Sequence, residues 1–481
     1  MLKKITIGLL ILFIVQMAFA QKPDLRFDKE GKFKIVQFTD IHWDDESVKS
    51  YPTIDIIESV LSEEKPNLVV FTGDIAFFPV KKSWQKIAKP VIDKKIFWTY
   101  VNGNHDEEFD MDRSKIVEYL TSLPYFIGES GPDNIHGYSN FNLLINGNKT
   151  NQPANILYFF DSNSYTHNPQ LGYYDWIKRD QVNWYYEQSK AYRKKFNKTL
   201  PGLAFFHIPL PEYKILLENH EYLGTANEGV ASPVVNSGLF STFLETGDVM
   251  GVFTGHDHNN DFIGTVCDIA LAFGRVTGTN AYGDFERGGR VIELEEGERK
   301  FTTWIRTKSG VELCYHYPDY DLYETDSTVY LKAIDGVAGK NGLNYTYHEG
   351  NFQSVFDMKP ENLIKKGITK DITINEPEEK DHFGYIYTGM IAIPDKAIYK
   401  FKLSSDDGSV LYIDDKEIIK NDGTHSVQDK IKIVGFDKGL HNFKLLYFDD
   451  YYGNELKVTI KSLKMEEQAI PVEMLMLPIS N

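Results

Sequence analysis

Cysteine is scarce in this sequence, which has only Cys267 and Cys314 in 481 residues. Two thiols exclude a fold built on disulfides and a metal cluster held by thiolates. We expect each cysteine to be a small buried residue, with a single disulfide between them as the alternative if the compartment is oxidising.

Positively charged residues are also fewer than negatively charged ones. The sequence has 52 Lys and Arg residues and 69 Asp and Glu residues, which gives a formal net charge of −17 at pH 7. This balance argues against a nucleic-acid scaffold, which needs a cationic surface to displace counterions from phosphates. It leaves open a small phosphoester substrate that is held locally by metal. Hydrophobic residues make up 42% of the chain, which excludes wholesale disorder and, at this length, predicts two or three domains.

Long hydrophobic runs are absent except at the N-terminus. Two lysines, an apolar run over residues 5–15 and the small residues Ala18 and Ala20 follow one another there. This order predicts a secretory signal peptide over residues 1–20, cleaved after Ala20. The run is short for a membrane-spanning helix, so an uncleaved anchor is the lesser alternative. We expect an exported protein, periplasmic or extracellular, with no membrane span after cleavage.

The rest of the chain shows two kinds of pattern. Residues 28–314 alternate short apolar runs with amphipathic stretches, which predicts an α/β sheet covered by helices. Residues 315–327 lack periodicity and are expected to be a linker. From 328 to 470, apolar and polar residues alternate between Gly and Asp turns, which predicts an all-β sandwich. In the first part, the expected strands are Phe33–Phe38, Leu68–Thr72, Ile96–Val101, Ile156–Phe160, Leu203–Phe206 and Val249–Phe253, and the expected helices are Thr53–Glu64, Trp84–Asp93 and Gln181–Phe196.

Oxygen and nitrogen donors follow five of these expected strands. They are Asp40 and His42, Asp74, Asn104 with His105 and Asp106, His207, and His256 with His258. Strand ends are where open α/β sheets place their ligand sites. A donor set without thiolate suits Mn, Fe or Zn and disfavours a structural Cys-zinc site.

The spacing of these residues favours two neighbouring ions. The D-x-H motif at 40–42 and the H-x-H motif at 256–258 each hold residues two apart, which point to the same side of an extended strand. Two cations about 3.5–4 Å apart repel each other, so they need a shared anionic ligand, and Asp74 is the best candidate. Each motif alone also fits a turn, a helix cap or a buried histidine. Together, in this order and all at strand ends, they predict a metal centre.

This motif set resembles that of the calcineurin-like metallophosphoesterases, most closely the branch related to purple acid phosphatases. The resemblance implies a four-layered α/β/β/α sandwich around a dinuclear metal centre. It implies that one metal is held by Asp40, His42 and His258, the other by Asn104, His207 and His256, and both by Asp74. It also implies that His105 lies beside the substrate and that Asp106 orients and polarises His105.

The function implied by the resemblance is metal-dependent phosphoric ester hydrolysis. Two divalent ions, Mn, Fe or Zn, lower the pKa of a shared water, and the hydroxide attacks phosphorus in line. Two positions depart from the purple acid phosphatase pattern: Phe77 replaces the tyrosine that binds ferric iron, and His42 replaces a glycine. We therefore expect a colourless enzyme. The choice among monoester, diester and pyrophosphate, the metal pair and the oligomeric state stay open.

Several other polar residues fit either a substrate contact or plain loop chemistry. Three follow the expected strand 156–160, and three lie in a glycine-rich loop beyond Arg275: Asp161, Asn163 and Tyr165, and Tyr282, Asp284 and Arg287.

The second part carries the run Ser404-Ser405-Asp406-Asp407-Gly408, followed by a hairpin pattern over 410–419. This run resembles the protective-antigen-type β-sandwich domain, which implies a glycan-binding role. Asp406 and Asp407 are then either calcium ligands, by the same resemblance, or residues of a hairpin turn. The rival interpretation of the whole chain is a surface glycan-binding protein whose phosphoesterase domain is idle. Against it, the sequence keeps every metal ligand and His105.

Overall fold

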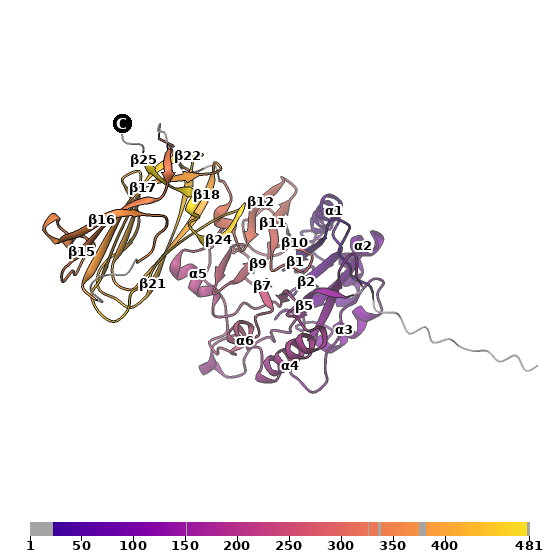
Figure 1. Cartoon of the computed structure of the whole chain (residues 1–481). Coiled ribbons are helices and arrows are strands. Elements are labelled where there is room, and N and C mark those ends of the chain that lie inside the picture. The colour runs from indigo at the N-terminus through magenta and orange to yellow at the C-terminus, as the bar shows by residue number, and fades with distance from the viewer. Residues whose placement is uncertain (1–22, 151, 326, 335–337, 375–380, 479–481) are drawn as a thin grey trace, which may run out of the picture. The chain divides into compact units, whose positions relative to one another are not determined.

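The computed structural model describes residues 23–150, 152–325, 327–334, 338–374 and 381–478 (Figure 1). Within these ranges the chain forms two compact units that divide between Pro318 and Asp319. The predicted signal peptide lies outside the described residues. No helix within them is long and apolar enough to cross a membrane.

The first sheet of the N-terminal unit has six strands in the order β12-β11-β10-β1-β2-β3. Its parallel strands are joined by helical crossovers, as the alternating sequence pattern predicts. The strands are β1 (Lys32–Phe38), β2 (Leu68–Thr72), β3 (Phe97–Val101), β10 (Gly288–Glu295), β11 (Phe301–Thr307) and β12 (Val311–Tyr317). The helices packed on it are α1 (Pro52–Glu64), α2 (Val80–Asp93) and α3 (Arg113–Thr121).

The second sheet also has six strands, in the order β4-β5-β6-β7-β9-β8. Strands β5, β6, β7 and β9 run parallel to one another. The strands are β4 (Phe141–Asn146), β5 (Pro153–Phe159), β6 (Gly202–Phe205), β7 (Val249–Thr254), β8 (Ile263–Val266) and β9 (Ile269–Phe273). The helices on this side are η1 (Pro169–Leu171), α4 (Arg179–Phe196), α5 (Tyr213–Asn219) and α6 (Leu239–Thr246).

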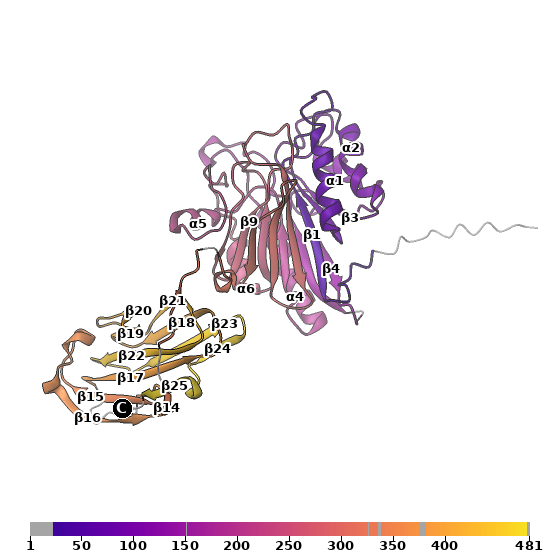
Figure 2. The same ribbon diagram turned by 90° about the horizontal axis from the view of Figure 1, so that it is seen from above.

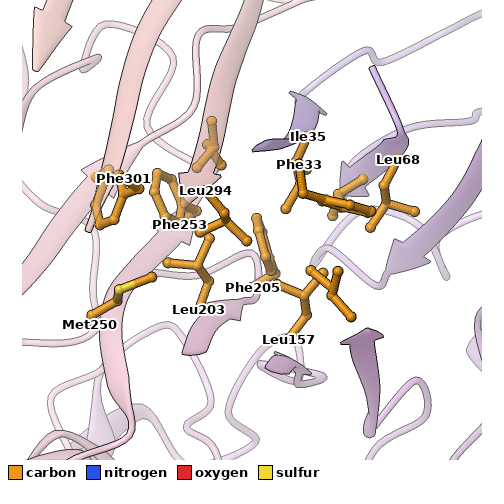
Figure 3. Close-up of a cluster of buried hydrophobic side chains, with 14 of the residues drawn as sticks. Phe33, Ile35, Leu68, Leu157, Leu203, Phe205, Met250, Phe253, Leu294 and Phe301 are labelled. Atoms are coloured by element: carbon orange, nitrogen blue, oxygen red, sulfur yellow. The ribbon is translucent and has the colours of Figure 1, made fainter. Parts of the chain in front are cut away.

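A hydrophobic core joins the two sheets face to face (Figure 3). Phe33 and Leu68 of the first sheet are buried in one cluster with Phe205 and Phe253 of the second. A separate cluster, which includes stacked Trp84 and Trp98, packs helices α1 to α3 against the outer face of the first sheet. A third packs α4 to α6 against the second sheet. The predicted four-layered α/β/β/α arrangement is therefore confirmed, and α1 and α2 are seen against the first sheet in Figure 2.

Two local expectations differ from the structure. Residues 315–317, expected as the start of a linker, end strand β12, because alternating Tyr315 and Tyr317 point into the core between the sheets. Cys267 and Cys314 are exposed and not joined by a disulfide, although we expected buried residues. Cys267 lies in the turn between β8 and β9, and Cys314 lies on an edge strand, so both face outward.

The C-terminal unit is an all-β sandwich, as predicted. Its first sheet has the order β13-β21-β18-β23-β24, and its second runs β14-β25-β17-β22-β19-β20, with β15 paired to β16 and β17. Long antiparallel strands β17 and β22 lie side by side at its centre (Figure 2). The strands are β13 (Tyr330–Leu331), β14 (Ala338–Asn341), β15 (Leu343–Glu349), β16 (Leu363–Thr369), β17 (Phe383–Ile393), β18 (Ala397–Ser405), β19 (Ser409–Ile413), β20 (Lys416–Asn421), β21 (Gln428–Phe436), β22 (Gly439–Asp449), β23 (Leu456–Ser462), β24 (Met465–Ala469) and β25 (Leu475–Pro478).

Short 3₁₀ turns connect several of these strands, and the expected hairpin over 410–419 forms between β19 and β20. The turns are η2 (Tyr320–Leu322), η3 (Val355–Asp357), η4 (Pro360–Asn362) and η5 (Val472–Met474).

Candidate metal centre

The loops after five parallel strands converge at one end of the N-terminal unit. The loops after β1 and β2 are tied together, because the backbone N–H of Asp40 donates to the Gly73 carbonyl at 3.2 Å and that of His42 donates to the Asp74 carbonyl at 3.0 Å. The loop after β7 joins them, because the N–H of His256 donates to the Asp40 carboxylate. Backbone hydrogen bonds therefore fix the register of the site independently of any bound ion.

Four of the residues proposed as ligands have a left-handed backbone. The φ angles are 51° at Asp40, 46° at His42, 56° at Asp74 and 82° at His256. Such angles are uncommon for residues other than glycine, and they cluster at functional sites, where the surrounding structure holds them in place. At these loops the backbone turns sharply, so that each side chain returns toward a common centre.

Two glycines allow the loops to approach this closely. A Cβ atom at Gly103 would lie 2.2 Å from Oδ1 of Asp74, and one at Gly255 would lie 1.9 Å from Oγ1 of Thr39. Both distances are far shorter than van der Waals contact. Glycine at these positions therefore serves close packing of the loops that carry the ligands.

The side chains form two groups of three. In the first, Nε2 of His258 lies 3.3 Å from Oδ1 of Asp40 and 3.2 Å from Nε2 of His42. In the second, Nε2 of His207 lies 3.1 Å from Oδ2 of Asp74 and 3.3 Å from Nδ1 of His256. Each group offers three donor atoms that lie within 4.8 Å of one another.

Asp74 connects the two groups. The same Oδ2 atom that faces His207 lies 3.7 Å from Nε2 of His42, which belongs to the other group. The backbone N–H of His105 donates to Oδ1 of Asp74 at 2.8 Å and holds the carboxylate in this orientation. Asp74 is therefore placed between two cation-sized positions, as its predicted bridging role requires.

The electrostatic state of these groups suits metal binding. Burial raises the pKa of Asp40, but nearby His258 and His207 outweigh burial and lower that pKa to about 2. The pKa of Asp74 is likewise held well below its usual range, chiefly by His207 against the effect of burial. Burial lowers the pKa of His42 to about 4 and that of His256 to about 3. The carboxylates are thus anionic and these imidazoles neutral, which are the forms that ligate metals.

His207 differs from the other histidines. Burial opposes its protonation, but the carboxylates of Asp74 and Asp40 outweigh burial and raise its pKa to about 9. Its Nδ1 lies 2.7 Å from the Thr72 carbonyl, which only accepts, so Nδ1 is the donor. Nε2 is thereby turned toward Asp74 as the atom available to a metal.

One buried oxygen among the proposed ligands, Oδ1 of Asn104, has no hydrogen-bond partner in the described part of the chain. Unpaired buried polar atoms are costly and rare in native proteins. Asn104 donates its own amide N–H to the hydroxyl of Tyr165 at 2.8 Å, which leaves its carbonyl oxygen free to ligate. This oxygen, with the two groups of three, fits a pair of divalent cations.

Comparison with known proteins identifies the two units. Residues 33–260 match the family described as calcineurin-like phosphoesterase, and residues 339–473 match the PA14 domain. The chain is 34% identical over 347 residues to the Arabidopsis thaliana protein "Probable inactive purple acid phosphatase 29". The aligned region covers 65% of this chain and 89% of that protein. The chain belongs to the calcineurin-like phosphoesterase family.

Two further relatives of this chain show the same similarity. "Probable inactive purple acid phosphatase 14" of Arabidopsis thaliana is 34% identical over 322 residues, which is 59% of this chain and 80% of that protein. "Phosphatase DCR2" of Saccharomyces cerevisiae is 37% identical over 314 residues, which is 58% of this chain and 54% of that protein. The aligned part therefore corresponds to the N-terminal unit in length.

Asp106 of the phosphoesterase unit lies between two loops. Its buried carboxylate accepts three backbone N–H groups, from Asp74, Ile75 and Gly103, each at 2.8 Å. These bonds clamp the loop after β2 to the loop after β3. That Asp106 orients His105 stays a prediction, and the carboxylate that contacts the His105 ring is that of Glu108.

Glu108 and Tyr165 surround the exposed side of His105. Nδ1 of His105 lies 2.9 Å from Oε2 of Glu108 and 3.4 Å from the Tyr165 hydroxyl. That hydroxyl donates to the other Glu108 oxygen at 3.1 Å. Of the loop residues that the sequence left open, Tyr165 therefore belongs to the site. Asp161 instead pairs with buried Arg113, and the Asn163 amide donates to the Trp176 carbonyl.

An open pocket of about 310 Å³ lies over the two groups of ligands. Phe77 lines it, with its ring 5.1 Å from that of His42, at the place where purple acid phosphatases have their tyrosine. Tyr282 lines it as well, stacked on His258, whereas Arg287 donates to three carbonyls of the same loop. Tyr174, whose ring lies 4.5 Å from that of His256, had no signal in the sequence.

Proposed function

We propose that this protein hydrolyses phosphoric esters at two divalent cations held by its N-terminal unit. The observation that carries the proposal is the convergence of two three-residue donor groups on either side of Asp74. Membership of the calcineurin-like phosphoesterase family supports the same chemistry.

The ligand assignment follows from the two groups. One cation would be held by Asp40, His42 and His258, and the other by Asn104, His207 and His256, with Asp74 available to both. Oxygen and imidazole donors suit Mn, Fe and Zn alike. Two such cations, when bound, supply the positive charge that acidifies water and neutralises phosphoryl oxygens.

His105 is the residue we assign to the reacting ester. Its side chain is 37% exposed and lines the pocket beside the ligands. With Nδ1 directed at Glu108, Nε2 is the atom left to contact a phosphoryl or leaving oxygen. There it stabilises developing negative charge and provides a proton to the departing alkoxide.

The rival function is that of a glycan-binding protein with an idle phosphoesterase unit. Two Arabidopsis relatives carry the word "inactive" in their names. In this chain all seven proposed ligands and His105 are present, and the ligands converge on one site. An idle unit has no need for four strained ligand positions or for the unpartnered buried oxygen of Asn104.

A hydrolysis panel separates the two functions. The full chain is loaded in turn with Mn, Fe or Zn and given matched phosphate monoesters, diesters and pyrophosphate. Hydrolysis by wild type, lost together with metal in Asp74→Asn and slowed with metal retained in His105→Ala, is the expected result. Wild type that binds two ions and turns over none of these esters would overturn the proposal.

For the C-terminal unit we infer glycan binding at the loop after β22. Tyr451 and Tyr452 in this loop are 56% and 95% exposed, and large exposed rings are suited to stacking on sugars. Buried Asp449 beside them has no hydrogen-bond partner for either carboxylate oxygen among the described residues, which fits a calcium ligand. Asp407 accepts the N–H groups of His425 and Asp450 and so also serves the turn.

A glycan array with and without calcium tests this second activity. Binding that requires calcium and is lost in Tyr452→Ala is expected, with exposed Val427→Ala as the control. An array without hits and without a calcium effect would remove the inference. We also propose export with cleavage after Ala20, which N-terminal sequencing of the secreted protein tests.

A further inference from the structure

The mouth of the phosphoesterase pocket has an unusual charge. Its lining holds the aromatic rings of Phe77, Tyr174 and Tyr282, and among its lining residues there is no lysine or arginine. The nearby guanidinium of Arg287 donates to the carbonyls of Ala281, Tyr282 and Gly283. No lysine or arginine of the lining therefore contacts the part of the substrate beyond the phosphoryl group.

Two carboxylates lie next to residues that line this mouth. Glu228 accepts from the Tyr282 hydroxyl at 3.1 Å and from the Asn259 backbone N–H at 2.6 Å, so it is fixed beside the ring that stacks on His258. Glu108 accepts from the Tyr165 hydroxyl and faces His105, with its side chain 38% exposed. These two charges repel any anionic group that enters with the ester.

Aromatic rings accompany both carboxylates. Tyr282 is 55% exposed beside Glu228. Tyr173 is 69% exposed, and its ring lies 5.1 Å from that of Tyr165, whose hydroxyl donates to Glu108, and 5.2 Å from that of Tyr174. Ring faces next to carboxylates attract organic cations, including quaternary ammonium groups, through the ring quadrupole.

Resting on the proposed phosphoesterase function, we propose that the pocket selects esters whose alcohol carries an organic cation. The phosphoryl group occupies the metal centre, and an ammonium group two or three bonds along the alcohol lies between the rings and carboxylates of the mouth. Esters that carry a second phosphate or a carboxylate are disfavoured by Glu108 and Glu228. The net charge of −17 adds a long-range preference of the same sign.

A pair of substrates that differ only in charge tests the proposed selection of esters with a cationic alcohol. Phosphocholine and 3,3-dimethylbutyl phosphate have the same shape, but the second carries a neutral tert-butyl group in place of trimethylammonium. We expect kcat/KM of the metal-loaded full chain to be about tenfold higher for phosphocholine. Phosphoglycolate, whose alcohol carries a carboxylate, is expected to fall below both.

Substitutions test which residues cause the preference for phosphocholine over 3,3-dimethylbutyl phosphate. Glu228→Gln and Tyr282→Ala are expected to bring the ratio of the two kcat/KM values toward one, whereas Glu221→Gln, at an exposed residue of the same loop region, keeps the wild-type ratio. Because the ratio is measured within one preparation, loss of folding or metal lowers both values and leaves the ratio unchanged.

A binding measurement separates this inference from the proposed function. Choline and 3,3-dimethylbutan-1-ol are titrated into the full chain and followed by tyrosine fluorescence, which needs no turnover. Tighter binding of choline, weakened in Tyr282→Ala, supports the inference even if none of the esters is hydrolysed, which would contradict the proposed function alone. Equal or reversed affinities, or hydrolysis without preference for phosphocholine, would overturn the inference and leave the phosphoesterase function standing.

Discussion

Nδ1 of His105 lies 2.9 Å from Oε2 of Glu108, three residues further along the same loop. The contact fixes the ring so that Nε2 faces the pocket. Asp106, the neighbour that the motif predicts for this role, ties together the backbone of two loops. The carboxylate that contacts the His105 ring is an exposed one that can be altered without disturbing the core.

Glu108→Gln tests this relationship. The variant keeps a hydrogen-bond partner for Nδ1 but removes the charge, so we expect kcat to fall about tenfold with metal content unchanged. Steady-state kinetics and elemental analysis measure these quantities. Glu107→Gln is the matched control, because Glu107 faces Arg113 rather than His105. An unchanged kcat in Glu108→Gln, or an equal loss in the control, would contradict the assignment.

Metal affinity should depend on pH through His207. Its pKa is raised to about 9, so below that pH the Nε2 atom carries a proton that an incoming cation displaces. The apparent affinity is expected to rise with pH up to about 9, by about tenfold per unit, and then to level off. His42 and His256 have lowered pKa values and release no proton near neutrality.

Calorimetry in two buffers of different ionisation enthalpy measures this release. At pH 7.5 we expect about one proton to leave per chain when the site fills. Release of no protons, with an affinity that is flat between pH 7 and 9, would show that His207 does not ligate through Nε2.

Close packing at Gly103 makes it sensitive to a single methyl group. The Cβ atom of Gly103→Ala would lie 2.2 Å from Oδ1 of Asp74, so the loops must separate. We expect a loss of about 1–3 kcal/mol in the free energy of unfolding, together with weaker metal binding. Gly229→Ala is the control, since a Cβ there meets nothing within 4 Å. Denaturant unfolding curves that coincide for the two variants would refute the packing argument.

The phenylalanine at position 77, in place of a tyrosine, leads us to predict a colourless protein. A phenyl ring has no oxygen with which to ligate ferric iron, so the iron-loaded protein should show no tyrosinate charge-transfer band in the visible spectrum. The Phe77 ring lines the pocket 5.1 Å from the His42 ring, close enough for a hydroxyl added in Phe77→Tyr to approach the site. A purple band in iron-loaded wild type would contradict the prediction.

The sequence pattern was sufficient to predict an α/β fold and the convergence of the ligands, whereas the four layers were implied by the family resemblance. Strands such as β2 and β7 are continuous apolar runs, and the polar residue that follows each run had to lie at a strand end. The parallel strands of each sheet end on one edge, and the two sheets pack face to face, so Asp40 after β1 and His256 after β7 meet although they belong to different sheets. The boundaries of the elements agree within a few residues for the same reason.

The features of the site that could not be predicted from the sequence depend on the conformation of the loops. Tyr174 reaches His256 across 82 positions, from an irregular segment without periodicity. The different roles of Asp106 and Glu108 follow from the left-handed turn at Asp74, which brings its backbone N–H onto Asp106. Tyr315 and Tyr317 looked like linker residues because aromatic alternation over three residues is too short to indicate a strand.

Direct counting of bound ions tests the central claim. Full-length wild type and Asp74→Asn are reconstituted with Mn or Zn, freed of excess metal and measured by elemental analysis, with anomalous diffraction to locate the ions. We predict two ions per wild-type chain, about 3.5–4 Å apart on either side of Asp74, and fewer than one in the variant. A wild-type chain that binds a single ion or none, or binds its ions away from Asp40, Asp74 and His207, would contradict the account.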